Sequence, residues 1–387
     1  MILLIAVCHS AESRLLLKLT MSKLSPQRRA TDKKPSYPIG DELREYLARF
    51  NRDMELPVRY SQLLHWDEAM PLYDKEGEDT LWLTVVYAPE KMKHFSQGLK
   101  KIYAMLKTDG DLSFMDHLYV DRIDFCTFGN SNPFRIRIVN SHNDNQDYYY
   151  IKKADASRIF GLELEHLLSP NRMHYFTFHN TLAEEHIVGI PGDMFIDKWL
   201  NSKRLKSVRI AKELVKFNER CFIRLLGDMR AYNFIVDITP DFEDIQLKIR
   251  PMDFDQQCYN GRLNFYRPQF FKENNELVFF CTKHLNIATS LQYQREEQTH
   301  IYRRMQLGHH RFENLLACMR ATELSTPNKV KQLRTSLAEF YKHSPFEACE
   351  SMGEIVSVNL HRLAHALRSS QQPIYNHFTA PSEDQWE

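Results

Sequence analysis

The sequence predicts an α+β protein in which most strands precede most helices. Short runs of apolar residues with strand-like alternation are concentrated between residues 118 and 188. Apolar residues then recur with helical spacing through much of residues 202–368. With 387 residues, the chain is long enough to bury a large core and to form two lobes.

Composition is typical of a soluble protein in a reducing compartment. Hydrophobic residues make up 43% of the chain and charged residues 26%. Because 51 Lys and Arg nearly balance 50 Asp and Glu, no net field favours nucleic acid or an anionic membrane. The seven cysteines include no Cys-x-x-Cys pair, which favours free thiols. The apolar run at residues 1–8 is shorter than the roughly twenty residues of a membrane span. We therefore expect a cytoplasmic protein.

The first third of the chain predicts a tail followed by an accessory segment. Residues 1–38 are expected to be a loose tail. Residues 39–115 form an accessory α+β segment, with helices predicted at 39–51 and 89–106 around a strand at 81–87. The sequence does not indicate what this segment does.

Residues 116–190 are predicted to form a mainly antiparallel β lobe. We expect strands at residues 118–128, 134–140, 148–153, 173–178 and 185–188. A helix at residues 156–168 should interrupt them, capped by Asp155 or Ser157. The Gly-Ile-Pro-Gly sequence at 189–192 predicts a break between this lobe and the next.

Residues 191–368 are predicted to form a mostly helical lobe, followed by a polar tail at 369–387. We expect helices at residues 194–200, 202–226, 275–291, 296–322, 329–343 and 346–368. Two short strands, at residues 234–238 and 246–252, should form a hairpin within this lobe.

The most informative stretch surrounds that hairpin. Asp228 and Asn233 stand five residues apart before it, and Asp253-Phe254-Asp255 follows it. Each of these residue types is common in loops, so the pair alone carries little information. An acid, an asparagine, a hairpin and a second acid together are typical of a catalytic loop followed by a metal-binding aspartate.

Upstream residues could complete a nucleotide site. Lys152 and Lys153 end the third predicted strand, and the next helix carries Glu163 and Glu165. Strand alternation places the two lysines on opposite faces. The Tyr150-Ile151-Lys152 sequence resembles the Val-Ala-Ile-Lys motif of kinase-like folds, and this resemblance favours Lys152. Glu163 is the expected partner of this lysine, with Glu165 as the alternative. An exposed lysine pair and a solvated acidic helix face would explain the same residues.

The loop before the second strand of the β lobe could contact a phosphate. It contains Gly129, Asn130 and Ser131, whose backbone N–H groups could meet an anion in a tight turn.

The order of these features resembles the protein-kinase-like fold across residues 118–368. The resemblance is closer to atypical phosphotransferases, of the aminoglycoside- and choline-kinase type or the bacterial HipA type, than to eukaryotic protein kinases. The sequence departs from the eukaryotic pattern at several positions. Only Gly129 represents the glycine-rich loop, Leu226-Gly227 stands in place of His-Arg, and Asp255 replaces the glycine of Asp-Phe-Gly.

The resemblance implies ATP and Mg²⁺ as ligands. Asn233 and Asp253 would bind Mg²⁺, which prefers oxygen ligands, and Asp255 would add a further ligand. Asp228 would accept or orient the proton of the attacking hydroxyl. Arg230 could contact the transferred phosphate or pair with a carboxylate.

The same resemblance assigns the nucleotide contacts. Lys152 would hold the α- and β-phosphates and Glu163 would orient Lys152, with Lys153 as the alternative lysine. The loop carrying Gly129, Asn130 and Ser131 would cover the phosphates. The backbone of residues 184–189 would meet the adenine.

The expected function is therefore ATP-dependent transfer of a γ-phosphoryl group to a hydroxyl of a protein or a small molecule. A nucleotide-binding pseudokinase and an AMP-transferring enzyme are alternatives on the same fold. A non-enzymatic α+β binding protein, in which the Asp/Asn spacing is coincidental, is a further alternative.

Overall fold

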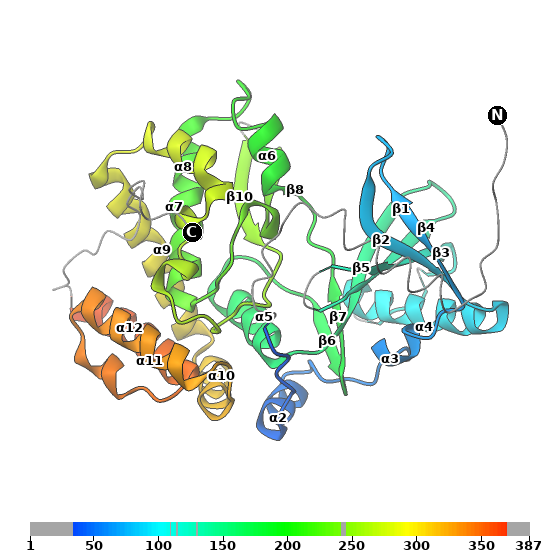
Figure 1. Cartoon of the computed structure of the whole chain (residues 1–387), viewed down its shortest axis with the longest axis horizontal. Helices are drawn as coiled ribbons and strands as arrows, with labels where there is room; N and C mark the ends of the chain where they lie inside the picture. Colours follow the sequence, from blue (N-terminus) through cyan, green and yellow to red (C-terminus); the bar gives the residue numbers. More distant parts are fainter. Residues whose placement is uncertain (1–33, 109, 114, 129–130, 241–244, 370–387) are drawn as a thin grey trace, which may run out of the picture. The chain divides into compact units, whose positions relative to one another are not determined.

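In the computed structural model, an antiparallel sheet adjoins a larger region of helices (Figure 1). The structure describes residues 34–108, 110–113, 115–128, 131–240 and 245–369. Nearly all of the tail predicted for residues 1–38, and all but one residue of the tail predicted for 369–387, lie outside these ranges. Among the described helices, none is long and apolar enough to cross a membrane.

The first sheet contains seven strands in the described part of the chain. Their order is β1-β2-β3-β4-β5-β7-β6, and every neighbouring pair is antiparallel. The strands are β1 (Glu68–Tyr73), β2 (Asp79–Val86), β3 (Leu118–Cys126), β4 (Phe134–Asn140), β5 (Gln146–Lys153), β6 (Tyr175–Phe178) and β7 (Thr181–Glu185). Because β2 pairs with β3, the predicted accessory segment and the β lobe share one sheet.

Two strands differ from the prediction. The strand expected at residues 185–188 is wrong, because β7 spans Thr181–Glu185 and the chain leaves the sheet after Glu185. Strand β1 was not predicted. It lies at the sheet edge with five of its six residues exposed, so it lacks the apolar alternation that marks a half-buried strand.

One face of this sheet is apolar and packs on helix α4 (Pro89–Thr108). Ile136, Tyr149 and Ile151 from the sheet meet Leu99 and Ile102 from the helix in one buried cluster. Since successive side chains in a strand point to opposite faces, Lys152 lies on the other face of β5 from Ile151.

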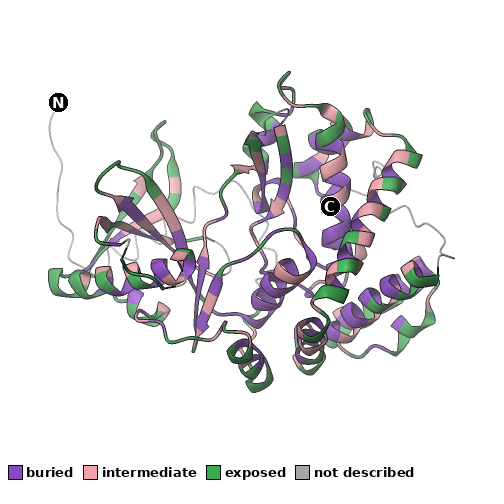
Figure 2. Cartoon of the chain, turned by 180° about the vertical axis from the view of Figure 1, so that it is seen from behind, coloured by how far each residue is buried: buried purple, intermediate pink, exposed green. Residues whose placement is uncertain are grey.

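Helix α5 spans Ala156–Leu168, as predicted. The Asp155 carboxylate caps it by accepting a hydrogen bond from the Arg158 backbone N–H at 3.2 Å. Every residue of its first ten is buried, so polar as well as apolar faces of the helix are covered (Figure 2). A helix buried on all sides must find partners inside the protein for each of its charged side chains.

Other helices surround α5 and a second sheet of three strands, in the order β10-β9-β8. This sheet comprises β8 (Ile190–Pro191), β9 (Phe234–Pro240) and β10 (Ile245–Pro251). Helix α3 (Tyr60–Leu63) instead packs on the first sheet, against β5 and β7. The remaining helices are α2 (Asp41–Arg49), α6 (Gly192–Lys198), α7 (Ser207–Arg224), α8 (Asn275–Thr282), α9 (Ile287–Leu307), α10 (His309–Ala321), α11 (Pro327–Tyr341) and α12 (Met352–Ser369). Short 3-10 turns are η1 (Ala231–Asn233), η2 (Leu263–Tyr266), η3 (Pro268–Phe270), η4 (Lys272–Asn274) and η5 (Ser344–Ala348).

Two of the helices predicted in this region are interrupted in the structure, and the helices predicted at 202–226 and 346–368 begin only at Ser207 and Met352. The helix expected at residues 275–291 ends after Thr282, and α9 begins anew where Asn286 accepts a hydrogen bond from the Thr289 N–H at 2.8 Å. The helix expected at 296–322 is divided at Gly308, between α9 and α10. In both places the apolar residues keep their helical spacing across the break, so periodicity alone does not reveal it. The break is marked only by a capping residue, Asn286 in the first case and Gly308 in the second.

Candidate functional site

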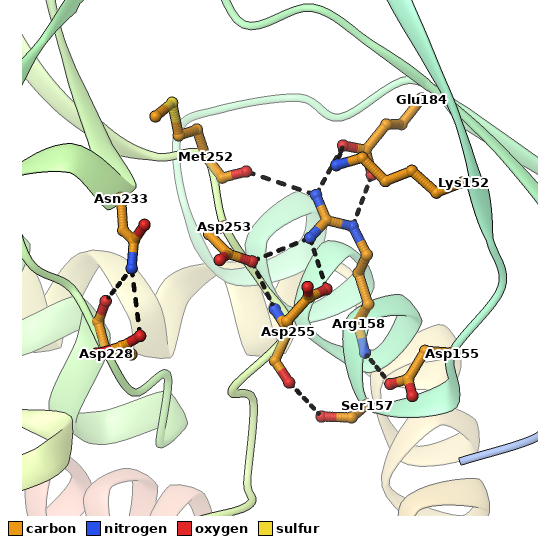
Figure 3. A network of polar contacts seen from close by, with 10 residues as sticks. All are labelled: Lys152, Asp155, Ser157, Arg158, Glu184, Asp228, Asn233, Met252, Asp253 and Asp255. Atoms are coloured by element: carbon orange, nitrogen blue, oxygen red, sulfur yellow. Dashed lines mark hydrogen bonds and ion pairs between the residues drawn. The ribbon is translucent and has the colours of Figure 1, made fainter. Parts of the chain in front are cut away.

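The loop after α7 brings Asp228 and Asn233 together. Leu225 ends the helix with φ 55°, and Asp228 itself has φ 59°, so the chain turns sharply twice. Asn233 then donates from Nδ2 to the Asp228 carbonyl oxygen at 2.7 Å and to its Oδ2 at 3.4 Å. This contact orients the amide, because Nδ2 faces Asp228 and Oδ1 is turned away from it (Figure 3).

The β9–β10 hairpin returns the chain to the same place. Phe234 at the start of β9 is opposite Pro251 at the end of β10. The Asn233 carbonyl then accepts hydrogen bonds from the N–H groups of Met252 at 3.0 Å and Asp253 at 3.4 Å. Asp253 consequently lies beside Asn233, with 34% of its side chain exposed (Figure 3). The structure therefore brings Asp228, Asn233 and Asp253 together.

Arg158 of α5 is the centre of the polar contacts on the other side of Asp253 (Figure 3). Its Nε and Nη2 donate to the two carboxylate oxygens of Glu184 at 2.9 and 2.7 Å. Its Nη1 donates to Asp253 Oδ1 at 3.1 Å and to Asp255 Oδ1 at 2.8 Å. One guanidinium thus joins the sheet, through β7, to the acidic segment that follows β10.

Lys152 pairs with Glu184 of β7. The expected ion pair between Lys152 and Glu163 is wrong, and so is the alternative pair with Glu165. In the pairing of β5 with β7, Lys152 is opposite Leu182. Glu184 lies two residues further along β7, so its side chain is on the same face of the sheet as Lys152. The partner of the lysine comes from the adjacent strand, and the helix contributes Arg158 instead of an acid.

Both glutamates of α5 have other buried partners. Glu163 accepts two contacts from Arg311 Nη2, each of 2.8 Å, and one from Tyr175 Oη at 2.5 Å. Glu165 pairs with Arg224 of α7 and accepts a hydrogen bond from Ser169 Oγ at 2.6 Å. These ion pairs hold α5 to its neighbours.

The remaining predicted residues have different surroundings. Lys153 is exposed at the end of β5, and Ser131 is partly exposed before β4. Gly129 and Asn130 lie outside the described residues. Arg230 pairs with two carboxylates, through Nε to Asp228 Oδ1 and through Nη1 to Glu273 Oε1, both at 2.7 Å. Of the two roles expected for Arg230, the contacts match carboxylate pairing.

The described contacts around Arg158 join two cations, Arg158 and Lys152, to three carboxylates, Glu184, Asp253 and Asp255. Burial and the neighbouring Asp255 raise the pKa of Asp253 to about 6, against the opposing effect of Arg158. Burial and Arg158 lower the pKa of Lys152, against the opposing effect of Glu184. A cation bound beside Asp253 would favour the ionised form of its carboxyl group.

The oxygen atoms present fit Mg²⁺ held jointly with a phosphate. Among the described residues, no group of three or more His, Cys, Asp and Glu could hold a metal ion by itself. Mg²⁺ usually keeps several waters and takes only one or two carboxylates together with substrate phosphates. Asn233 Oδ1 and the partly exposed carboxylate of Asp253 are such a donor set, whereas Asp255 is buried against Arg158.

Sequence reasoning missed Arg158 and Glu184. Arg158 lies in the predicted helix at residues 156–168, whereas Glu184 lies just before the strand expected at 185–188. Charged residues are almost never fully buried unless they are paired. Glu184 directly follows Leu182-Ala183, and Arg158 directly precedes Ile159-Phe160. A charged residue next to an apolar pair was the available signal that its side chain would be buried. This signal could not show that Arg158 pairs with Glu184, which is 26 residues away.

Comparisons with known proteins do not place the chain in a family. No model of a protein family matches it, and no curated protein is significantly similar to it.

Proposed function

We propose that the protein is an ATP-dependent phosphotransferase that transfers a γ-phosphoryl group to a hydroxyl. The observation that carries this proposal is the convergence of Asp228, Asn233 and Asp253 beside the buried Lys152–Glu184–Arg158 group. Sequence positions 152 and 253 are a hundred residues apart, so chance spacing within one loop does not account for it. The protein-kinase-like resemblance remains part of this proposal.

Each residue has a role that its contacts permit. Asp228, whose pKa is raised by burial against the effect of Arg230, would accept or orient the proton of the acceptor hydroxyl. Asn233 and Asp253 would supply oxygen ligands to Mg²⁺. Mg-ATP, when bound, would supply the phosphoryl group and the charge neutralisation that its transfer requires. Arg158 would hold Asp253 in place.

One observation favours a second candidate, a nucleotide-binding pseudokinase. Lys152 is bonded to Glu184, and only 9% of its side chain is exposed. To contact a phosphate, the ammonium group would have to exchange part of that ion pair for the ligand. A protein in which this exchange fails would bind nucleotide without transferring it.

Binding and turnover of Mg-ATP test the proposal. Calorimetry should detect ATP binding that depends on Mg²⁺ in the parent and is lost in Asp253→Ala. Asp197→Asn, an exposed change on α6, is the matched control and should bind as the parent does. Equal binding by Asp253→Ala and the parent would contradict the assignment.

Labelled ATP then distinguishes the reactions. The purified protein is incubated with cell extract and with ATP labelled at the γ or the α position. Transfer of γ label that falls at least about 100-fold in Asp228→Asn, while ATP binding persists, is expected for phosphoryl transfer. Transfer of α label would indicate AMP transfer, and binding without transfer would indicate a pseudokinase.

A further inference from the structure

Four side chains from distant parts of the sequence meet at Glu163, on α5. We call these four and Glu163 itself the Glu163 cluster: Tyr46, Arg52, Glu163, Tyr175 and Arg311. Tyr46 and Tyr175 donate their hydroxyls to the carboxylate, and Arg311 contacts both of its oxygens. Burial alone would raise the pKa of Glu163, but Arg311 and the two hydroxyls outweigh it, so the pKa is lowered. The carboxylate is therefore an anion at neutral pH.

Residues 41–52, which we call the α2 segment, supply two of these side chains. Tyr46 lies on α2, and Arg52 follows three residues after the helix ends. Arg52 donates from Nη1 to the Tyr175 carbonyl at 3.4 Å and from Nη2 to the Met173 carbonyl at 3.1 Å. It therefore also binds the backbone at the start of β6. Arg311 comes from α10, which packs against both α2 and α5 (Figure 1). The α2 segment thus connects the sheet, α5 and α10.

The same helix α5 supports the acidic segment after β10 through three separate contacts. Arg158 binds Asp253 and Asp255, as described above. Ser157 Oγ donates to the Gln257 carbonyl at 2.6 Å. Gly161 lies so close that a Cβ atom there would be 2.9 Å from Cβ of Phe254, the residue between the two aspartates. Any shift of α5 therefore displaces the side chains around Asp253.

We infer that the α2 segment is a brace whose Tyr46, together with Arg311, holds Glu163 and thereby positions α5 and the Asp253 carboxylate. Tyr46, Glu163 and Arg311 are positioning residues in this arrangement, because they act through α5 and not on a ligand. The inference rests on the proposed function for its catalytic meaning, since it assigns α2 to the geometry of the Mg²⁺ site. It also gives the first part of the accessory segment a role.

Helix rigidity supports this coupling. Glu163 and Arg158 are five residues apart on one helix, which corresponds to about 7.5 Å along its axis. Because backbone hydrogen bonds keep this part of α5 rigid, a displacement of the helix at Glu163 also displaces Arg158. Reacting and metal-binding groups are sensitive to displacements of about 1 Å.

Hydrogen exchange on the full chain tests the brace without relying on any ligand. Tyr46→Phe removes one hydroxyl oxygen from the Glu163 cluster. Tyr87→Phe is the matched control, because Tyr87 is equally buried (4% exposed, against 3% for Tyr46) and its hydroxyl donates to the Leu63 carbonyl, away from α5. Amide exchange in a peptide covering residues 252–258 should rise about tenfold in Tyr46→Phe and stay at the parental rate in Tyr87→Phe.

A second variant and an activity measurement complete the test. Arg311→Lys keeps the positive charge but loses the two-point contact with Glu163, and it should raise exchange in the same peptide. In both variants the Mg²⁺ concentration for half-maximal ATP turnover should rise about tenfold, with Tyr87→Phe unchanged.

The outcomes separate the two proposals. Parental exchange at residues 252–258 in Tyr46→Phe, or a rise spread equally over the whole chain, would overturn the brace. Raised local exchange in a protein whose parental form shows no Mg-ATP turnover would support the brace and overturn the phosphotransferase proposal instead.

Discussion

Arg158 and Glu184 form a two-point ion pair inside the protein, with Nε–Oε2 at 2.9 Å and Nη2–Oε1 at 2.7 Å. Their side chains are only 2% and 7% exposed. The pair joins α5 to β7, and the remaining Nη1 of Arg158 holds Asp253 and Asp255. The geometry of the acidic segment therefore depends on a contact between the helix and the sheet.

Replacing Arg158 by Lys should destabilise the protein strongly. An ammonium group cannot reproduce the planar fork that satisfies three carboxylates at once, so at least one would stay buried without its partner. We expect the free energy of unfolding to fall by about 3–5 kcal/mol, measured by urea denaturation. Lys153→Arg, at an exposed position, is the control and should change stability by less than about 0.5 kcal/mol. Equal stability of Arg158→Lys and the parent would contradict the central role of this side chain.

A pair of double-mutant cycles tests which glutamate is the partner of Lys152. The first combines Lys152→Met with Glu184→Gln, and the second combines Lys152→Met with Glu163→Gln. Because Glu184 contacts Lys152 whereas Glu163 is paired with Arg311, we expect a coupling energy of about 2 kcal/mol in the first cycle and about zero in the second. Unfolding free energies from urea titrations supply each value. A larger coupling energy in the cycle with Glu163 would show that Glu163 is the partner of Lys152, as the sequence suggested.

Gly161→Ala should weaken the contact between α5 and the acidic segment. The added Cβ would lie 2.9 Å from Cβ and 3.1 Å from Cδ1 of Phe254, and neither atom is the free end of a flexible chain. Overpacking should outweigh the better helix propensity of alanine, for a net loss of about 1–2 kcal/mol in unfolding free energy. Gly40→Ala adds a Cβ with no heavy atom within 4 Å, so its loss of unfolding free energy should be limited to about 0.5 kcal/mol, from the N-cap position of Gly40 on α2. An equal effect of the two substitutions would argue against close packing at Gly161.

Protonation of His166 should destabilise the protein in mild acid. Its Nδ1 accepts a hydrogen bond from the Met173 N–H at 3.3 Å and lies 3.3 Å from Arg52 Nη2, which requires a neutral ring. Burial and Arg52 lower the pKa of His166 to about 4. As pH falls from 6.5 to 4, the unfolded chain takes up a proton that the folded chain does not, so stability falls over that window.

The matched variant for this pH effect is His166→Gln, which retains an acceptor without titrating. Between pH 7 and pH 4 the parent should lose about 2 kcal/mol more unfolding free energy than His166→Gln, measured by urea denaturation at each pH. Parallel pH profiles for the two proteins would show that His166 does not titrate as its surroundings imply.

Much of the fold could be predicted because its signals are local. Helix α5 was predicted with its bounds and with Asp155 as one of two candidate caps, and strand β4 was predicted with its bounds, because periodicity and capping act within a few residues. Where the local signal was weak, prediction was wrong, as at exposed β1 and at the α9–α10 break near Gly308.

The residues of the candidate site also differ in how far their contacts depend on the local sequence. Asp228, Asn233 and Asp253 are linked by one loop and one hairpin, so their meeting follows from sequence neighbours and a short turn. The partner of Lys152 depended on which strand lies beside β5, and that strand is β7, reached only after α5 and β6. Strand order is set by packing of the whole sheet, and no local pattern records it.

By itself, the sequence determined the α+β class, most of the elements and three of the polar residues that meet. Only the tertiary structure decided that Glu184, and neither Glu163 nor Glu165, holds Lys152, and that Arg158 holds Asp253. The physical reason is burial. A charged side chain removed from water must take whichever opposite charge the surrounding elements bring within reach, and those elements lie 26 to 97 residues away for Arg158.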